Sequence, residues 1–276
     1  MKAEFLAVLV TILLAPCLAV AGSNPWDRNL PFKEAAITYA ISGMETGQEF
    51  FYIRDHGKKM ARHRSVSTTM LGVTQKMATI EITDPDWVYS FDLREHTGTK
   101  SVNPQKIMIE EYDKLSAVEK KKVNENAEKM AGGFMGAVQG AVEPNVKEIH
   151  GYSCDKVSAM GSTIYAIHGT SISLLSESSI MGITVKSEAI EVKEEGADEK
   201  YFQFPQGIVP QPNAEADQMA RMMAEQMIAG LKDPEGFKKK SQGILGLPSG
   251  GQPEIPKEDQ MQMEEAMNTL KQLLGK

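Results

Sequence analysis

The side chains best suited to chemistry in this 276-residue chain are five histidines and two cysteines. The histidines are scattered along the sequence, at His56, His63, His96, His150 and His168. Zinc needs three or four convergent ligands, and no two of these histidines have the H-x-x-H or H-E-x-x-H spacing. Cys154 follows His150 by four residues, which in an extended strand separates them by about 13 Å. We therefore expect no metal site, and we interpret Cys154 as a buried thiol that does not react while the protein is folded.

Methionines near the C-terminus are the second candidate for chemistry. Soft thioethers can select Cu(I), but neither helix predicted there contains a histidine or a cysteine. Two other interpretations stay open: an adaptable contact face for a partner, or ordinary packing against the rest of the chain. The candidate partner-binding residues are Met219, Met223, Met227, Met263, Met267 and Leu270.

Signatures of common catalytic sites are absent from the sequence. It contains no G-x-x-x-x-G-K-[ST] phosphate loop, no G-x-G-x-x-G dinucleotide fingerprint and no G-x-S-x-G nucleophile turn. The carboxylates are abundant but follow no recognisable pattern. We expect a protein that is not an enzyme and that uses no cofactor. The net charge of −7 argues against a nucleic-acid partner.

The N-terminus has the organisation of a secretory signal peptide. Lys2 precedes a mainly apolar run from Phe5 to Leu14, and Ala19-Val20-Ala21 has the small residues that a signal peptidase recognises. The run is shorter than the roughly 20 residues that a membrane-spanning helix needs. We predict cleavage after residue 21 and export to the periplasm. Lipid attachment at Cys17, or an anchor that is retained, are the alternatives.

Residues 32–104 have the period of an antiparallel meander, with short β-branched and aromatic runs separated by Gly, Asp and Pro. Every second residue is a large apolar one in the first run and an aromatic one in the last. We predict that both apolar sets point to one concave side of the sheet, where an apolar ligand could bind. These candidate ligand-binding residues are Ile37, Tyr39, Ile41, Trp87, Tyr89 and Phe91.

The period changes to that of a helix over about 105–142, with a break expected near Ser116. A second β block then runs from 146 to 209, with hairpin turns at each Gly-containing pair and a last strand at 201–204. Within the long run 178–195 the parity of the apolar residues changes, which predicts a bulge near Ser187.

The chain changes character again after Pro212. Asn213 can cap an amphipathic helix, a Gly/Pro-rich linker covers 243–256, and a last amphipathic helix follows. We predict a domain at 22–212 with the helical insertion inside it. Residues 213–276 would be a Met-rich appendage that the domain does not need for folding.

Several turn motifs support a resemblance to a known fold. They include Thr83-Asp84-Pro85-Asp86-Trp87, Arg54-Asp55-His56-Gly57-Lys58 and Gly151-Tyr152-Ser153-Cys154. Over about residues 32–209 the chain resembles an uncharacterised family of exported bacterial proteins, which is itself similar to the periplasmic lipoprotein carriers and their outer-membrane receptors. The resemblance implies an α+β fold, a curved antiparallel sheet forming an unclosed β-barrel with covering helices. It also implies that acyl chains bind on the concave face.

From these observations we expect a periplasmic binding module that holds an apolar ligand, such as an acyl chain, or a segment of a partner protein. Peripheral association with the envelope would fit this role. The alternative is an envelope scaffold that acts through its C-terminal Met-rich helices.

Overall fold

The computed structural model describes residues 24–26, 30–70, 73–137, 141–159, 161–180 and 183–234. The chain divides into two compact units, Met1–Lys232 and Asp233–Lys276. The predicted signal peptide and Cys17 lie outside the described residues. So do the 243–256 linker and the last helix with Met263, Met267 and Leu270.

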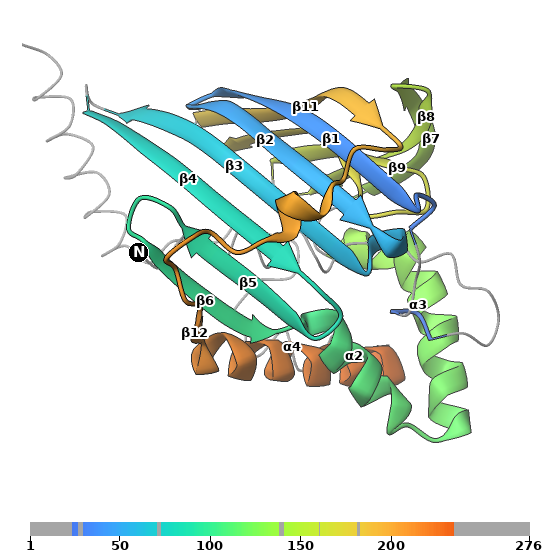
Figure 1. The fold of residues 1–276 in the computed structure, drawn as a ribbon. Coiled ribbons are helices and arrows are strands. Elements are labelled where there is room, and N and C mark those ends of the chain that lie inside the picture. The colour runs from blue at the N-terminus through green and yellow to red at the C-terminus, as the bar shows by residue number, and fades with distance from the viewer. Residues whose placement is uncertain are drawn as a thin grey trace, which may run out of the picture. The chain divides into compact units, whose positions relative to one another are not determined.

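A mostly antiparallel sheet of 12 strands dominates the first unit (Figure 1). The strand order is β12-β6-β5-β4-β3-β2-β1-β11-β10-β9-β8-β7, so the sheet has two ends and does not close. It consists of two meanders, β1–β6 and β7–β11, that join through the β1–β11 pair. The strands are β1 (Glu34–Gly43), β2 (Glu45–Arg54), β3 (Lys59–Met70), β4 (Val73–Thr83), β5 (Trp87–Asp92), β6 (Thr97–Val102), β7 (Ala141–Ile149), β8 (Tyr152–Ala159), β9 (Ser162–Ile167), β10 (Ser173–Ile180), β11 (Ile183–Lys193) and β12 (Gln211–Pro212).

Two local predictions for the strands have different outcomes. The β1–β11 register shifts between Thr38 and Tyr39, and Ile190 is the residue without a partner, three positions from the expected bulge. The strand predicted at 201–204 is wrong, because these residues lie largely in the 3-10 helix η2 (Glu199–Phe202). There Phe202 is buried against the face of the sheet, so packing and not strand pairing places this segment.

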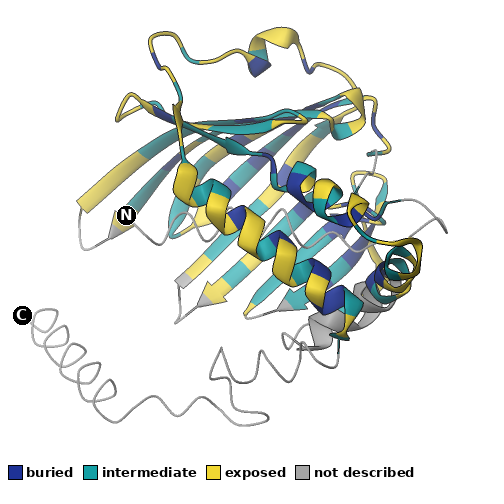
Figure 2. Ribbon diagram, turned by 90° about the horizontal axis from the view of Figure 1, so that it is seen from below, coloured by how far each residue is buried: buried dark blue, intermediate teal, exposed yellow. Residues whose placement is uncertain are grey.

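In the described part of the chain, three helices lie on one side of the sheet: α2 (Pro104–Asp113), α3 (Ala117–Ala137) and α4 (Ala214–Lys232) (Figure 2). Asn103 caps α2 by accepting a hydrogen bond from the Gln105 amide at 2.9 Å. The chain breaks at Ser116, as predicted, and starts again with a capping box in which the Ser116 amide donates to Glu119 Oε2 at 2.9 Å. Because α2 and α3 connect β6 with β7, they link two strands near opposite ends of the sheet order.

The helices have an apolar core of their own, separate from the sheet. Its buried members are Ile107, Met108, Tyr112, Val123, Ala127, Ala220, Ala224, Ile228 and Leu231. Four of these belong to α4, and Asp217 of α4 accepts a hydrogen bond from the Val102 amide at 2.7 Å. The sequence analysis set the domain boundary near 212, whereas the compact unit continues through α4 to Lys232.

The pairing register defines two faces of the sheet, since directly paired residues point to the same side. Ile37 pairs with Phe51, and the row continues through Arg62 to Glu81; we call this side the inner face. On the other side, the outer face, Tyr52 lies in one row with Ala61, Ile82 and Tyr89.

The six apolar candidates therefore lie on opposite faces, and the prediction of one shared side is wrong. Ile37, Tyr39 and Ile41 are on the inner face, while Trp87, Tyr89 and Phe91 are on the outer face. A period of two shows which residues of one strand share a face. It does not relate one strand to the next, because each turn can change the parity.

Candidate functional site

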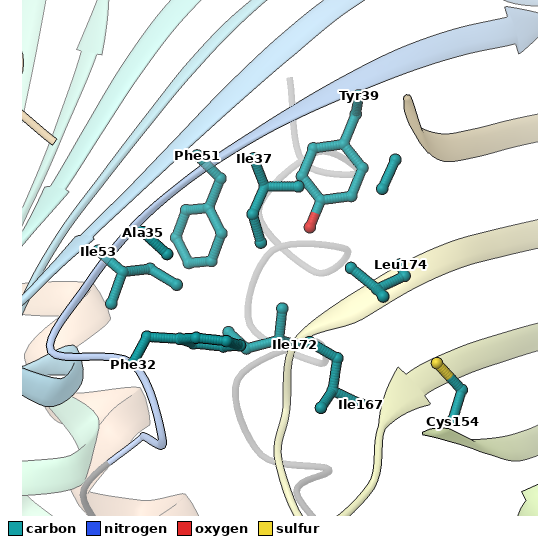
Figure 3. Close-up of a cluster of buried hydrophobic side chains, with 11 residues drawn as sticks. Phe32, Ala35, Ile37, Tyr39, Phe51, Ile53, Cys154, Ile167, Ile172 and Leu174 are labelled. Carbon is teal, nitrogen blue, oxygen red and sulfur yellow. The ribbon is translucent and has the colours of Figure 1, made fainter. Parts of the chain in front are cut away.

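The largest apolar cluster of the sheet lies on the inner face and draws on both meanders (Figure 3). Its members are Phe32, Ala35, Ile37, Tyr39, Phe51, Ile53, Cys154, Ile167, Ile172, Leu174 and Ala189, here called the inner apolar cluster. The sheet is curved enough for side chains of β1 and β2 to meet those of β8, β9 and β10. The Tyr39 hydroxyl donates to the Ser173 carbonyl at 2.8 Å, and burial raises the pKa of Tyr39 well above its ordinary value.

A group of charged residues continues the same face across β2, β3 and β4. These residues are Glu45, Glu49, Arg62, Arg64 and Glu81, here called the inner charged cluster. Arg62 forms an ion pair with Glu49, and Arg64 forms one with Glu45. Arg64 also lies 3.5 Å from Glu49, whose side chain is buried. The guanidinium of Arg62 lies 4.5 Å from the centre of the Phe51 ring, so it joins the charged cluster to the apolar one.

Glu81 is the carboxylate of this group whose charge is least satisfied. It forms no hydrogen bond or ion pair with another residue that the structure describes. Burial raises the pKa of Glu81, the charge of Arg62 lowers it, and Glu49 raises it again. For Arg62, burial lowers the pKa, but Glu49 and Glu81 more than offset this, so the guanidinium stays charged. The cluster thus has three carboxylates and two guanidinium groups.

The sequence analysis missed the inner charged cluster, although the sequence carries a signal for it. Arg62 and Arg64 alternate along β3 with the same parity as Met60, and Glu45 and Glu49 share parity with Phe51. Charges at positions that should face the core are unusual, because an unpaired buried charge is costly. That parity was the detectable feature.

The outer face is covered by the chain itself. Residues 194–210, here called the outer strap, cross the face opposite to the helices (Figure 2). Tyr201 stacks on Tyr52 at 3.9 Å, and burial together with Tyr201 raises the pKa of Tyr52 to about 12. Glu199 pairs with both Arg54 and Lys59.

The aromatic candidates of β5 lie under or beside this strap. The ring of Phe204 is 4.6 Å from Tyr89 and 5.2 Å from Phe91, and Phe91 is fully buried. Trp87 is partly buried, with Lys100 Nζ 4.7 Å from its ring centre. On the outer face these residues already have partners from their own chain.

The candidate methionines of α4 do not form its buried stripe. The buried residues are Ala220, Ala224, Ile228 and Leu231, and Met227 packs beside them. Met223 is partly buried, whereas Met219 and Met222 are exposed.

Cys154 is fully buried in the inner apolar cluster, and burial raises its pKa. His150 does not serve it as a base, because its Nε2 contacts the Ala189 carbonyl at 2.7 Å. His168 Nδ1 lies 2.7 Å from Asp155, which also accepts a hydrogen bond from the Asn145 amide. Within the described ranges, no three His, Cys, Asp or Glu residues are grouped so as to hold a metal ion. In the same ranges no helix is long and apolar enough to cross a bilayer.

Comparisons with known proteins add little to this geometry. No protein-family model matches the chain, and no curated protein matches it. An uncharacterized conserved protein from Thermus thermophilus is similar to 65% of this chain and 91% of its own length, with 10% identity and a TM-score of 0.38. PNGF-II is similar over 69% of this chain and 33% of its own length, with 11% identity and a TM-score of 0.33. Likeness at this level carries no functional argument, so the function has to be argued from the inner face itself.

Proposed function

We propose that the protein is an exported, non-enzymatic binding module whose curved sheet acts as an unclosed barrel. Its inner face would hold an apolar ligand or a segment of a partner protein. The observation that carries the proposal is the junction at Arg62, where an apolar cluster and a charged cluster meet on one face. A binding site of this kind combines an apolar surface with a few polar groups that orient the guest.

The charges favour some guests over others. Glu81 lacks a partner among the described residues, and the cluster has one carboxylate more than it has guanidinium groups. A ligand carboxylate would be repelled there, whereas an N–H donor or an ammonium group would satisfy Glu81. An acyl chain linked through an amide, or a peptide segment with apolar side chains, therefore fits better than a free fatty acid.

The route of the guest follows from exposure. Ile37, Tyr39 and Ile41 are 1%, 6% and 4% exposed, so these candidates are already covered by the rest of the chain. The side chains of Arg62 and Arg64 are 39% and 31% exposed. A guest would enter along β3 and β4, contact the arginines first, and reach the apolar residues by displacing side chains beside Phe51.

The N-terminal sequence supports a periplasmic location, with lipid attachment at Cys17 as the alternative. The resemblance to lipoprotein carriers supports an acylated guest in the same compartment. Both statements rest on sequence features and belong to the proposal.

A second candidate function is an envelope scaffold that acts through α4. The specific observation in its favour is the pair Met219 and Met222, which are 38% and 47% exposed and three residues apart on one side of the helix. Adaptable methionines at an exposed position suit a protein contact.

The test uses a fluorescent N-palmitoyl peptide amide and a fluorescent fatty acid as probes of the full chain. We expect the peptide amide to bind more tightly than the fatty acid. Glu81→Gln should weaken the peptide amide by about tenfold or more, because hydrogen bonds to charged groups are among the strong ones. Arg94→Gln, a change at an exposed turn, is the matched control and should leave binding unchanged. Failure of both probes to bind, or equal binding by Glu81→Gln and the parent, would overturn the proposal.

A further inference from the structure

Two long hairpins end in apolar residues at the same end of the sheet. Met70 pairs with Val73 at the end of β3–β4, and Ile180 pairs with Ile183 at the end of β10–β11. The turns 71–72 and 181–182 lie outside the described residues. Met44 occupies the β1–β2 turn between these hairpins, where its amide donates to the Thr184 carbonyl.

The register places these ends at one level. A single row of paired residues runs through Val66, Gly47, Ile41 and Ser187. Met70 lies four residues beyond Val66, and Ile183 lies four residues beyond Ser187 in the same direction along the sheet. Figure 1 shows these hairpin ends together at the left of the sheet.

The ends of the two long hairpins are free of charge. Residues 65–75 and 178–185 contain no Asp, Glu, Lys, Arg or His and are rich in Ser and Thr. Val73 is 63% exposed. Glu45, in the shorter β1–β2 hairpin, is the charge nearest to this level, and Arg64 neutralises it on the inner face. The turns at the opposite end of the sheet, at 55–58 and 84–86, contain two charged residues each.

We infer that this end of the sheet, here called the apolar rim (Met44, Met70, Val73, Ile180 and Ile183), docks on the surface of a lipid bilayer. Uncharged residues enter the membrane interface at low cost, whereas Asp, Lys and Arg oppose insertion. The stretch from Ser65 to Met70 covers about 16 Å of strand without a charge, more than the depth of a headgroup layer.

A bilayer fits the rim better than a protein partner does. Docking against a protein normally uses polar groups at the margin of the interface to fix orientation. The ends of the two long hairpins offer only hydroxyl, amide and apolar side chains, which impose no particular orientation. The acidic chain would also approach an anionic membrane with least repulsion through its charge-free end. The inference goes beyond the proposed function and does not depend on which guest the inner face binds.

The test places an environment-sensitive nitrobenzoxadiazole fluorophore on the full chain in a Cys17→Ser background. One variant carries Val73→Cys and the matched control carries Val209→Cys, at an exposed valine in the outer strap, while Cys154 is buried. On adding phosphatidylcholine vesicles, we expect a blue shift and a several-fold brighter emission at position 73 and no change at 209. Because the label reports its own position, membrane contact by the N-terminal segment does not produce the expected pattern.

Vesicle sedimentation gives a second readout. Val73→Asp should weaken binding by about tenfold, and Val209→Asp should leave it unchanged. An unchanged label at position 73, or an equal response at 73 and 209, would overturn the inference. So would a blue shift that depends on protein concentration without vesicles, because that result would mean that the rim packs against a second copy of the chain.

Discussion

Phe91→Ala tests the assignment of β5 to the outer face. Phe91 is fully buried between its own strand and the outer strap, next to the ring of Phe204. Truncating a buried Phe to Ala typically costs about 3–5 kcal/mol, since the transfer free energy is lost and a cavity stays behind. Phe50 lies on the same face but is 37% exposed. Phe50→Ala should therefore cost less, roughly 1–2 kcal/mol.

The expected cost for Trp87→Ala is also small. Trp87 is only partly buried, and its contact with Lys100 is worth about 0.5–1 kcal/mol. On the inner face, at the centre of the apolar cluster, the same substitution would have cost as much as Phe91→Ala. The ratio of the two costs thus reports the face on which β5 places its aromatic residues.

Chemical denaturation measures these differences, and a double mutant makes the test sharper. Gly98 pairs with Phe91, and a Cβ added at Gly98 would lie 2.7 Å from the Phe91 ring. Gly98→Ala should destabilise the parent and be tolerated in Phe91→Ala, where the ring is gone. Additive effects of Gly98→Ala and Phe91→Ala, or equal costs for Trp87→Ala and Phe91→Ala, would refute the assignment.

Three further predictions concern charge, the thiol and α4. Burial raises the pKa of Glu81, so its effect on stability is most favourable below its ordinary pKa of 4.5 and is lost as pH rises through the raised value; Glu81→Gln should therefore unfold at a higher temperature than the parent at pH 7 and show no advantage at pH 4. For Glu119 the sign is opposite, because hydrogen bonds from Lys232 and Ser116 lower its pKa to about 2; its stabilisation is present above 4.5 and lost as pH falls toward 2, and Glu119→Gln should lower the unfolding temperature at pH 7 but not at pH 2. Cys154 should react with a thiol reagent only after denaturation, and rapid labelling of native protein would contradict its burial. A chain that ends at residue 213 should unfold at a lower temperature than one that ends at 234, because it lacks four residues of the helix core; equal unfolding temperatures would show that α4 is an appendage after all.

The strand rhythm could be predicted from the sequence because turns and alternation are local. The break at Ser116 was equally local, since a capping box is written within four residues. The β6 strand escaped notice because Thr97, Gly98 and Thr99 have the composition of a turn. Gly98 has no side chain because the Phe91 ring fills that space, which depends on a neighbouring strand.

The site was harder to predict than the fold because it depends on parity across turns. Tyr39 and Phe91 both look like core residues, and both are, but in different clusters. Their relation is set by four intervening turns, each able to exchange the faces. The role of α4 was missed for another reason. Met219 and Met223 drew attention as a stripe, while small residues such as Ala220 and Ala224 make the closer contact between helices.

The single junction between the two meanders has a consequence for the order of folding. β1 pairs with β2 across a tight turn, but its other edge pairs with β11, so Ala36 waits for Lys193, far along the chain. Contacts of such long sequence separation form late, because the loop between them must first be closed. During synthesis or translocation β1 would expose an unpaired edge with Ile37, Tyr39 and Ile41 along it. Such an edge can pair with another chain, so the interval before β11 arrives is the time when this protein is most prone to aggregate.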